Sequence, residues 1–404
     1  MLSYDEAIRA VLGSIETLPV VEAPLLSVLG LTLAGDISMP YPSPPFDNSA
    51  MDGFAVRSID VACAASSAPV RLPVVDSVMA GDGARPPLPS GAAARIMTGA
   101  PVPDGADAVI PIEDTEQHEG SILVIEQVKH GAFIRRKGEE IAADAIVLTR
   151  GLTLTPSAIG MAAGAGRSSL SVHRRPAVCI LVTGDELVEP GEPLSYGQIY
   201  NSNAYSIAAL VVDAGCIVQE IIRAGDTREG LREALDRCIT ADVIISTGGV
   251  SVGDRDFVKE VVAERGAIDL WRAAIRPGKP FAFGRAGSSI FFGLPGNPVS
   301  AMVTFELFVR PALKRMMGQA DVMPMRRNAL LTEDISHDPG RRSFFRGILA
   351  EADGDRTVRL TGPQGSGMLS SLVAANCLVI VPEDVSSIPA GDVVTVIPLR
   401  PNIQ

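Results

Sequence analysis

A short run near the N-terminus gathers residues whose types could do chemistry. The run is "PPFDNSAMDGFAV", residues 44–56, and Asp47, Asn48, Ser49 and Asp52 give it two carboxylates, an amide and a hydroxyl. It contains neither His nor Cys, so a zinc-type ligand set does not account for it. The run contains hard oxygen donors. Their function has to be inferred from other parts of the chain.

Three other polar loops follow predicted buried strands. "TGDEL" (183–187) follows "AVCILV", "TGGVSVGDRD" (247–256) follows "ADVIIS", and "PGNPVS" (295–300) follows "SIFFGL". In an open parallel sheet, ligands bind outside the carboxyl ends of the strands, and glycine loops and helix N-termini are natural phosphate cradles. Tight turns would explain any one loop, but three at successive strand ends favour a phosphate site. The candidate substrate-binding residues are Thr183, Gly184, Gly248, Gly249, Ser251, Asn297 and Pro298.

None of these loops is a G-x-G-x-x-G or a Walker A motif, so no dinucleotide or P-loop site is indicated. Glu186, Asp226 and Asp256 fall in the strand-end loops, and Asp254 adds another carboxylate. Carboxylates on separate loops beside a phosphate cradle suit Mg²⁺, which keeps several waters and bridges carboxylate to phosphate. For Asp226, a helix N-cap or a surface ion pair is the alternative.

Positive charge gathers in three places on an otherwise acidic chain. The net charge of −12 weighs against a general nucleic-acid binder. The basic clusters are "IRRKGEE" (134–140), "WRAAIRPGKP" (271–280) and "GRRSFFRG" (340–347). They indicate pockets for a small anion, and Arg276 and Lys279 suit an oxyanion. Solvated surface charge is the alternative for each cluster.

The elements that must position these residues fall into several segments. Ser3 to Glu6 forms a capping box, so the chain opens with a helix. The four prolines of 39–47 predict an extended linker, and short β-type runs from about 54 to 150 predict a small β-domain. Strands alternating with helices from about 176 predict a doubly wound, mostly parallel sheet, and short strands return after about 325.

The predicted fold class is therefore α/β multidomain, with two small β-domains and an N-terminal helical and extended linker region. The predicted domains are 1–46 with 140–175 (helical and linker), 47–139 (small β), 176–323 (α/β) and 324–404 (C-terminal β).

Composition places the chain among globular proteins. Of its 404 residues 47% are hydrophobic and 20% charged, and no uninterrupted apolar run is long enough to span a membrane. The N-terminus lacks the basic region and long apolar run of a signal peptide, so we expect the cytoplasm. The five cysteines are scattered, which predicts reduced core thiols rather than disulfides or a zinc site.

Eight motifs along the chain resemble those of one family, in the expected order. They are "FDNSAMDGFAV", "RIMTGAPVP", "IRRKGEE", "TGDEL", "STGGVSVGDRD", "IRPGKPFAFG", "GLPGNPVSA" and "GPQGSGMLSS". They resemble the MoeA-type molybdopterin molybdenumtransferases, whose eukaryotic relatives include gephyrin and the plant molybdenum-insertion enzymes. The resemblance covers essentially the whole chain.

The resemblance implies a homodimer of elongated, four-part subunits. Its active site would lie at the strand ends of the α/β domain and be completed by the small β-domain of the other subunit, with Asp52 facing the "TGDE" loop. The implied reaction converts adenylylated molybdopterin and molybdate into molybdenum cofactor and AMP, with Mg²⁺. The adenylylating enzyme and apo-molybdoenzymes are the implied protein partners; no nucleic acid or membrane is implied.

The resemblance also implies roles for individual residues. The catalytic acids would be Asp52, Glu186, Asp226 and Asp256, with Mg²⁺ on Glu186 and Asp256; Thr98 would donate a hydroxyl to the substrate. The molybdate-binding residues would be Arg276, Lys279, Ser300, Arg346 and Ser366, with Arg346 chosen among the arginines of "GRRSFFRG". The chain departs from many relatives by Arg at 272 and 276 in place of Lys, Lys137 in place of Arg and Glu140 in place of Asp.

Three alternatives stay open at this point. One is a catalytically silent scaffold that binds molybdopterin, which the retained acids disfavour. Another is an enzyme that adenylylates molybdopterin, which the full-length match disfavours. The third is a paralogue that uses tungstate, which the sequence does not distinguish from molybdate because the two dianions have nearly equal size.

Overall fold

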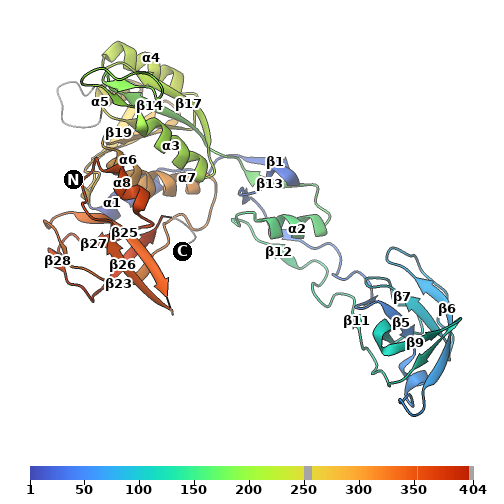
Figure 1. The fold of residues 1–404 in the computed structure, drawn as a ribbon. Coiled ribbons are helices and arrows are strands. Elements are labelled where there is room, and N and C mark those ends of the chain that lie inside the picture. Colours follow the sequence, from blue (N-terminus) through green and yellow to red (C-terminus); the bar gives the residue numbers. More distant parts are fainter. Residues whose placement is uncertain (250–256, 353, 400–404) are drawn as a thin grey trace. The chain divides into compact units, whose positions relative to one another are not determined.

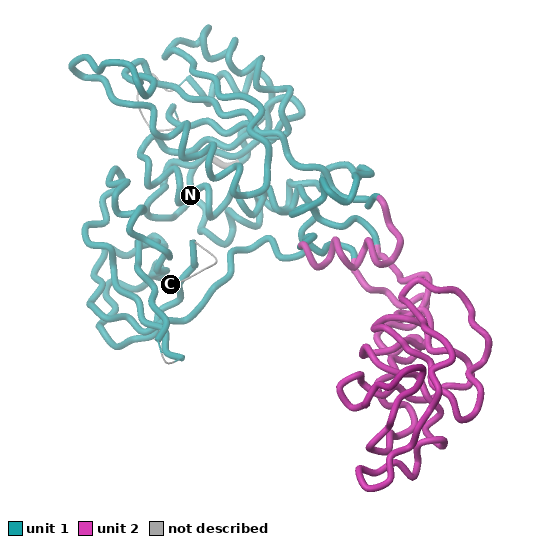
Figure 2. The backbone as a smooth tube through the Cα atoms, turned by 45° about the vertical axis from the view of Figure 1, so that its right-hand side comes forward, with its two compact units in different colours: residues 1–35, 150–155, 169–404 teal, residues 36–149, 156–168 magenta. Residues whose placement is uncertain are grey.

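The structure is a computed structural model that describes residues 1–249, 257–352 and 354–399. The chain divides into two compact units, coloured in Figure 2. Unit 1 contains residues 1–35, 150–155 and 169–404, and unit 2 contains residues 36–149 and 156–168.

The centre of unit 1 is a six-stranded sheet with the order β17-β14-β18-β22-β21-β19 (Figure 1). Its strands are β14 (Ala177–Thr183), β17 (Ile217–Ala224), β18 (Val243–Thr247), β19 (Gly266–Arg272), β21 (Pro280–Ala286) and β22 (Ser289–Leu294). The first four strands in the order are parallel, and β21 and β19 continue the sheet antiparallel. The predicted mostly parallel sheet is confirmed.

Alternating residues of the central strands pack on opposite faces, as the strand period of two requires. Val178, Ile180 and Val182 of β14 belong to one apolar core, whereas Cys179 and Leu181 belong to another. Helices α1, α3, α6 and α7 contribute to the first core, and α4 and α5 to the second. Both faces of the sheet are therefore covered, which makes the fold doubly wound.

Seven helices lie in the described part of unit 1, and all but α8 were predicted from the sequence. They are α1 (Tyr4–Gly13), α3 (Ser202–Asp213), α4 (Arg228–Cys238), α5 (Val258–Arg265), α6 (Pro298–Thr304), α7 (Arg310–Met316) and α8 (Leu369–Ala374). The predicted capping box at Ser3 and Glu6 starts α1. The helical segment that begins at Pro298 is interrupted by a π-helical segment, η4 (Phe305–Val309), because Pro311 has no N–H to donate to the preceding turn.

A second six-stranded sheet forms the C-terminal part of unit 1. Its strands are β20 (Ile275–Arg276), β23 (Arg327–Leu331), β25 (Arg342–Ala352), β26 (Asp355–Leu360), β27 (Cys377–Val381) and β29 (Val393–Pro398). Strand β25 pairs with β20, β26 and β27. Because β20 comes from the loop between β19 and β21, it carries Arg276 from the α/β segment onto this sheet.

The remaining strands of unit 1 form small sheets. They are β1 (Val20–Pro24), β2 (Thr32–Leu33) and β13 (Ser169–His173) in one sheet, β15 (Leu187–Val188) with β16 (Ile199–Tyr200), and β24 (Ile335–Ser336) with β28 (Ser387–Ile388). A 3₁₀ turn, η1 (Leu25–Ser27), follows β1.

Unit 2 contains the small β-domain predicted from the short strands after residue 54. Its six-stranded sheet consists of β5 (Gly53–Val56), β6 (Val70–Val78), β7 (Ala93–Ile96), β8 (Ala108–Pro111), β9 (Thr115–His118) and β10 (Ser121–Val124). The other elements are β3 (Ile37–Ser38), β4 (Asn48–Ser49), η2 (Ser58–Val61), η3 (Ile112–Asp114), β11 (Ile134–Arg135), β12 (Ile146–Leu148) and α2 (Pro156–Gly164).

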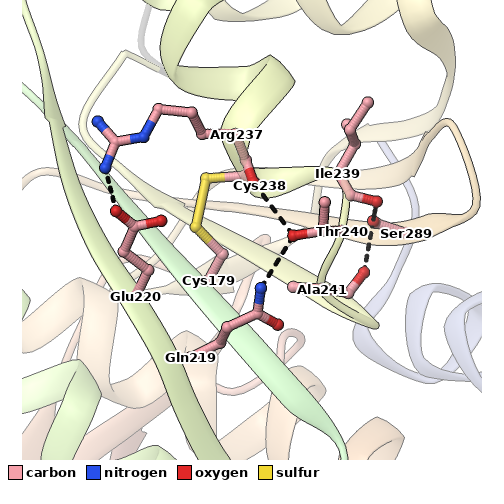
Figure 3. Close-up of a disulfide and its surroundings, with 9 residues drawn as sticks. All are labelled: Cys179, Gln219, Glu220, Arg237, Cys238, Ile239, Thr240, Ala241 and Ser289. Carbon is pink, nitrogen blue, oxygen red and sulfur yellow. Dashed lines mark hydrogen bonds and ion pairs between the residues drawn. A yellow bond between two sulfur atoms is a disulfide. The ribbon is translucent and has the colours of Figure 1, made fainter.

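The prediction that the cysteines are reduced is wrong for two of the five. Figure 3 shows Cys179 of β14 and Cys238 at the end of α4 joined by a disulfide. The two residues are 59 apart in the sequence, and their Cα atoms are 5.5 Å apart because α4 packs on β14. Such a pairing depends on the tertiary packing, which the spacing of the cysteines does not reveal. Cys63, Cys216 and Cys377 carry free thiols.

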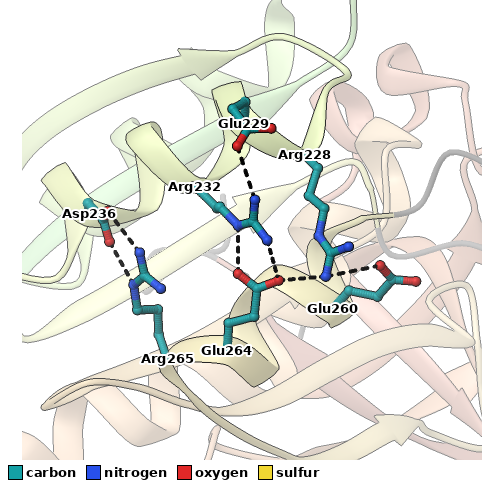
Figure 4. Close-up of polar contacts among 7 residues, drawn as sticks. All are labelled: Arg228, Glu229, Arg232, Asp236, Glu260, Glu264 and Arg265. Atoms are coloured by element: carbon teal, nitrogen blue, oxygen red, sulfur yellow. Dashed lines mark hydrogen bonds and ion pairs between the residues drawn. The ribbon is translucent and has the colours of Figure 1, made fainter.

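Ion pairs join α4 to α5 on the outer side of the sheet (Figure 4). The Glu264 carboxylate accepts hydrogen bonds from Arg232 at 2.6 and 2.8 Å and from Arg228 at 2.6 Å. Arg265 of α5 binds Asp236 of α4 at 2.8 and 3.0 Å. The two helices that cover this face are therefore held to each other as well as to the sheet.

No helix among the described residues is long and apolar enough to cross a membrane.

The disulfide predicts a defined thiol count. Alkylation of the unfolded, non-reduced chain should label three cysteines, and alkylation after reduction should label five. Mass spectrometry of the labelled protein measures both counts. Five labelled cysteines without reductant would show that Cys179 and Cys238 are reduced.

The ion pairs predict a pH dependence of stability. Hydrogen bonds from Arg232 and Arg228 lower the pKa of Glu264 from 4.5 to about 2. A lowered folded-state pKa stabilises the fold above the unfolded value of 4.5, and this contribution is lost as the pH falls towards 2. We expect Glu264→Gln to lower the unfolding temperature at neutral pH, and the difference from the natural chain to shrink below about pH 4.5.

Differential scanning calorimetry across this pH range measures the effect. Glu260→Gln is the matched control, because Glu260 approaches Arg228 only at 3.7 Å and its side chain is 59% exposed. A difference for Glu264→Gln that stayed constant with pH would contradict the assignment.

Candidate active site

A cavity of about 380 Å³ lies at the carboxyl ends of β14, β17, β18 and β22 in unit 1. The structure brings eight of the predicted residues to its wall, although their spacing in the sequence exceeds one hundred residues. They are Thr183, Gly184, Glu186, Asp226, Gly248, Gly249, Asn297 and Pro298. The parallel pairing of these strands explains the convergence, because it puts their following loops at one edge.

Two glycines let the loops after β14 and β18 approach each other closely. Gly248 and Gly249 have φ of +87° and +65°, where other residues are strained. A Cβ at Gly248 would lie 2.9 Å from the carbonyl oxygen of Thr183, and one at Gly249 would lie 2.4 Å from a methyl group of Val258. Glycine at both positions is therefore required for the close packing of this loop against Thr183 and Val258 at the cavity wall.

Asn203 is a cavity residue that sequence reasoning missed. It is 9% exposed, and its Nδ2 donates to Thr247 Oγ1 at 2.9 Å and to the Gly296 carbonyl at 2.7 Å. The carbonyl can only accept, which fixes the orientation of the amide. Asn203 thereby ties the loop after β18 to the loop after β22. The run "NSN" at the start of α3 is the only signal that could have indicated it, and asparagine there also suits a helix cap.

The acids at the cavity have the character of a partial cation site. The Glu186 carboxylate lies over Gly184, where a Cβ would come within 2.8 Å of it. Asp226 accepts a hydrogen bond from the Asp185 N–H, and Asp185 accepts one from the Asp226 N–H, both at 3.2 Å. Among the described residues no three His, Cys, Asp or Glu side chains could hold a metal ion together. Two separate carboxylates fit Mg²⁺ that takes its other ligands from water and substrate phosphate.

Three predicted site residues cannot be placed. Ser251, Asp254 and Asp256 lie outside the described residues.

Asp52 and Thr98 meet within unit 2. Asp52 Oδ1 accepts hydrogen bonds from the Thr98 N–H and from the Thr98 Oγ1 hydroxyl, both at 2.7 Å. These two bonds lower the pKa of Asp52, so the group is a carboxylate at neutral pH. The two residues come from distant motifs, "DNSAMDG" and "IMTGAP", and form one exposed polar pair beside β5 and β7.

The basic motif at 134–140 is used inside unit 2. Arg136 Nη1 donates to Asp47 at 2.7 Å, and the Lys137 backbone N–H donates to the same carboxylate at 2.8 Å. Glu140 accepts a hydrogen bond from Ser43 Oγ at 3.0 Å. Asp47 therefore holds the opening run to this motif, and the departure to Lys at 137 leaves the contact intact because the backbone makes it.

A second cavity of unit 1, of about 390 Å³, contains two of the predicted oxyanion residues, Arg276 and Arg346. Arg346 is 1% exposed; its Nε donates to Ser371 Oγ at 3.0 Å and an Nη donates to the Gly365 carbonyl at 3.1 Å. Within the described part of the chain no carboxylate pairs with it, and burial lowers the pKa of Arg346 to about 10. A buried cation that lines a cavity without a counter-charge is suited to an anionic ligand.

The neighbouring Arg342 has a different environment from Arg346. It binds Asp5 through two hydrogen bonds of 2.9 Å and Glu383 at 2.9 and 3.1 Å. Its charge is therefore already compensated. Lys279 is exposed and Ser300 is buried in α6, and neither lines this cavity.

One short segment connects the two cavities. Asn297, on the wall of the first cavity, donates through Nδ2 to Ser366 Oγ at 2.9 Å, and the Val299 N–H donates to the Ser366 carbonyl at 3.1 Å. The preceding residue, Gly365, accepts the hydrogen bond from Arg346. The strand-end loop and the C-terminal sheet are thus joined between the two cavities.

Three family models match the chain in sequence order. The MoeA N-terminal region (domain I and II) matches residues 2–166, a probable molybdopterin binding domain matches 179–315, and the MoeA C-terminal region (domain IV) matches 328–399. Together they cover most of the chain.

Full-length relatives agree with these matches. The chain is 42% identical over 398 residues to molybdopterin molybdenumtransferase 2 of Mycobacterium tuberculosis, covering 97% of this chain and 98% of the relative. It is 39% identical to the molybdopterin molybdenumtransferase of Haemophilus influenzae, covering 91% of each. A solved structure of the MoeA protein from Pyrococcus horikoshii superposes with a TM-score of 0.81 at 30% identity, covering 98% of this chain and 100% of that one. This chain belongs to the MoeA family of molybdopterin molybdenumtransferases.

Proposed function

We propose that the chain inserts molybdenum from molybdate into adenylylated molybdopterin and releases AMP. The observation that carries this proposal is the pair of cavities in unit 1, one suited to a phosphate-bearing ligand and one to an oxyanion, whose walls are linked through Gly365 and Ser366. A reaction that joins an oxometalate to a pterin nucleotide needs such a pair.

The first cavity suits the organic substrate. Its wall combines the backbone of the glycine loops with the apolar side chains of Leu187, Tyr200 and Leu231, so it offers both phosphate contacts and a surface for a flat ring. The second cavity suits molybdate through Arg276 and the buried Arg346. Ser366 lies between the two substrates, where its hydroxyl contacts Asn297.

The reaction needs no thiol or imidazole of the protein. Two pterin thiols form two Mo–S bonds and one molybdate oxygen leaves as water, while hydrolysis of the phosphoanhydride consumes one water and yields AMP. The residues of the chain have to hold two anionic substrates together and orient water at the phosphorus. Asp226 and Asp52 are carboxylates placed on loops for such orientation.

A magnesium ion would be held by Glu186 and Asp256. When bound, it neutralises phosphate charge and polarises the bond that breaks. Asp52 and Thr98 would complete this site from the other subunit of a homodimer, the arrangement that the family resemblance implies. The retained acids favour an active enzyme over a silent scaffold.

The first prediction of the proposed function concerns Asp52. Asp52→Ala should reduce molybdate-stimulated AMP release by about 100-fold or more, because it removes a charged group from the reacting centre. AMP release from adenylylated molybdopterin with Mg²⁺ and molybdate, measured by chromatography, tests this. Asp104→Ala, at an exposed position of the same β-domain, should release AMP at the natural rate.

Substrate that binds tightly without AMP release under molybdate or tungstate would contradict the proposed activity. AMP release with tungstate but not with molybdate would support the same mechanism with tungsten as the inserted metal.

The second prediction compares two arginines. Arg346→Met should lower the free energy of unfolding by no more than about 1 kcal/mol, because removal of an uncompensated buried charge offsets the loss of the hydrogen bonds to Ser371 and Gly365, and it should abolish molybdate binding. Arg342→Met should lower that free energy by about 1–2 kcal/mol, because Asp5 and Glu383 lose their partner. Urea denaturation and titration calorimetry measure both. Equal destabilisation by the two substitutions would contradict a ligand-binding role for Arg346.

A further inference from the structure

The two arginines of the second cavity differ in how their charge is compensated. Arg276 Nη2 donates to Asp338 Oδ2 at 3.0 Å, whereas no described carboxylate pairs with Arg346. Arg276, Asp338 and Arg346 all line this cavity. Among the residues that the structure describes, Asp338 is therefore the one acid on the wall of a site otherwise suited to an anion.

The ion pair between Arg276 and Asp338 is exposed and therefore weak. The Asp338 side chain is 85% exposed and the Arg276 side chain is 36% exposed, so water solvates both charges. An exposed ion pair of this kind contributes little free energy and is easily replaced by another anion. A dianion between Arg276 and Arg346 would accept hydrogen bonds from two charged donors. The Asp338 carboxylate has only one such donor, Arg276.

The backbone on both sides of Asp338 is fixed. The His337 N–H donates to the Ser386 carbonyl at 2.9 Å, and the Gly340 N–H donates to the Glu383 carbonyl at 2.6 Å. Displacement of the carboxylate can therefore occur by side-chain rotation, with the loop between β24 and β25 held in place.

A further group of the wall lacks a partner. Nε2 of His337 is buried without a hydrogen bond in the described structure, and Nδ1 contacts Ser343 Oγ at 3.2 Å.

We propose that Asp338 is an internal competitor that occupies Arg276 in the empty site and sets the affinity for the oxyanion. The inference rests on the proposed function, because it takes the second cavity as the oxyanion site. Asp338 holds Arg276 in the cavity wall when no ligand is present, and the entering dianion displaces the carboxylate into solvent. Its negative charge also repels the dianion, so it raises the concentration of oxyanion that the site requires.

Calorimetric titration of the full chain with sodium molybdate, and separately with sodium tungstate, tests the proposal. Asp338→Asn should tighten binding of each dianion about three- to tenfold, because it frees Arg276 and removes a repulsion. The gain should decrease at high salt, since both charges are exposed. Asp384→Asn is the matched control: it makes the same charge change at an exposed position of the same part of the chain, outside the cavity wall, and should leave the affinity unchanged.

Arg276→Ala separates this inference from the proposed function. If the natural chain binds the dianion and Arg276→Ala does not, the oxyanion site is supported. If Asp338→Asn then binds the dianion no more tightly than the natural chain, the competitor role of Asp338 is overturned. An equal gain in Asp384→Asn would also overturn it, because the effect would then be one of net charge. Absence of dianion binding in every variant would overturn both the competitor and the oxyanion site.

Discussion

The parallel pairing of β14 with β17 and β18, and of β18 with β22, is the constraint on which the candidate site depends. Strands β14, β18 and β22 are buried, β17 is a partly exposed edge strand, and all four end at the same edge of the sheet. Since parallel strands run in the same direction, the loops that follow them leave the sheet at the same edge. Thr183, Asp226 and Gly248 converge there for this reason alone.

The candidate site also depends on the contacts between the α/β segment and the C-terminal sheet. Strand β20 leaves the α/β segment and pairs with β25, which places Arg276 in one cavity with Arg346. The contact of Asn297 with Ser366 joins the same parts a second time. Two cavities, which we propose as the substrate sites, are formed by segments far apart in the sequence and are thereby held within one compact unit.

The outer face of the α/β sheet is fixed by covalent and ionic contacts as well as by packing. The disulfide between Cys179 and Cys238 links the central strand to the end of α4, and Glu264 links α4 to α5 through two arginines. β14 ends at Thr183 and leads directly into the loop of Glu186. Contacts that hold β14 in place therefore also hold these two residues of the cavity wall in place. Site residues that are held in place in this way need not rearrange when charge develops during the reaction.

The sequence by itself determined the elements and the composition of the site. Apolar runs of strand length, the Ser3 capping box and glycine at the loop ends are local signals, since each reflects the backbone or the burial of a few neighbouring residues. They sufficed for the mostly parallel sheet and for the acids of the strand-end loops, whereas the family was indicated by the resemblance of eight motifs.

Only the tertiary structure decided which partners those residues have. Nothing in the sequence distinguishes Arg346, which is buried without a counter-charge, from Arg342, which binds two carboxylates. The disulfide, the role of Asn203 between two loops and the contact of Asp338 with Arg276 were equally invisible. The physical reason is that hydrogen bonds and ion pairs form between side chains that packing brings within about 3 Å, whatever their separation along the chain.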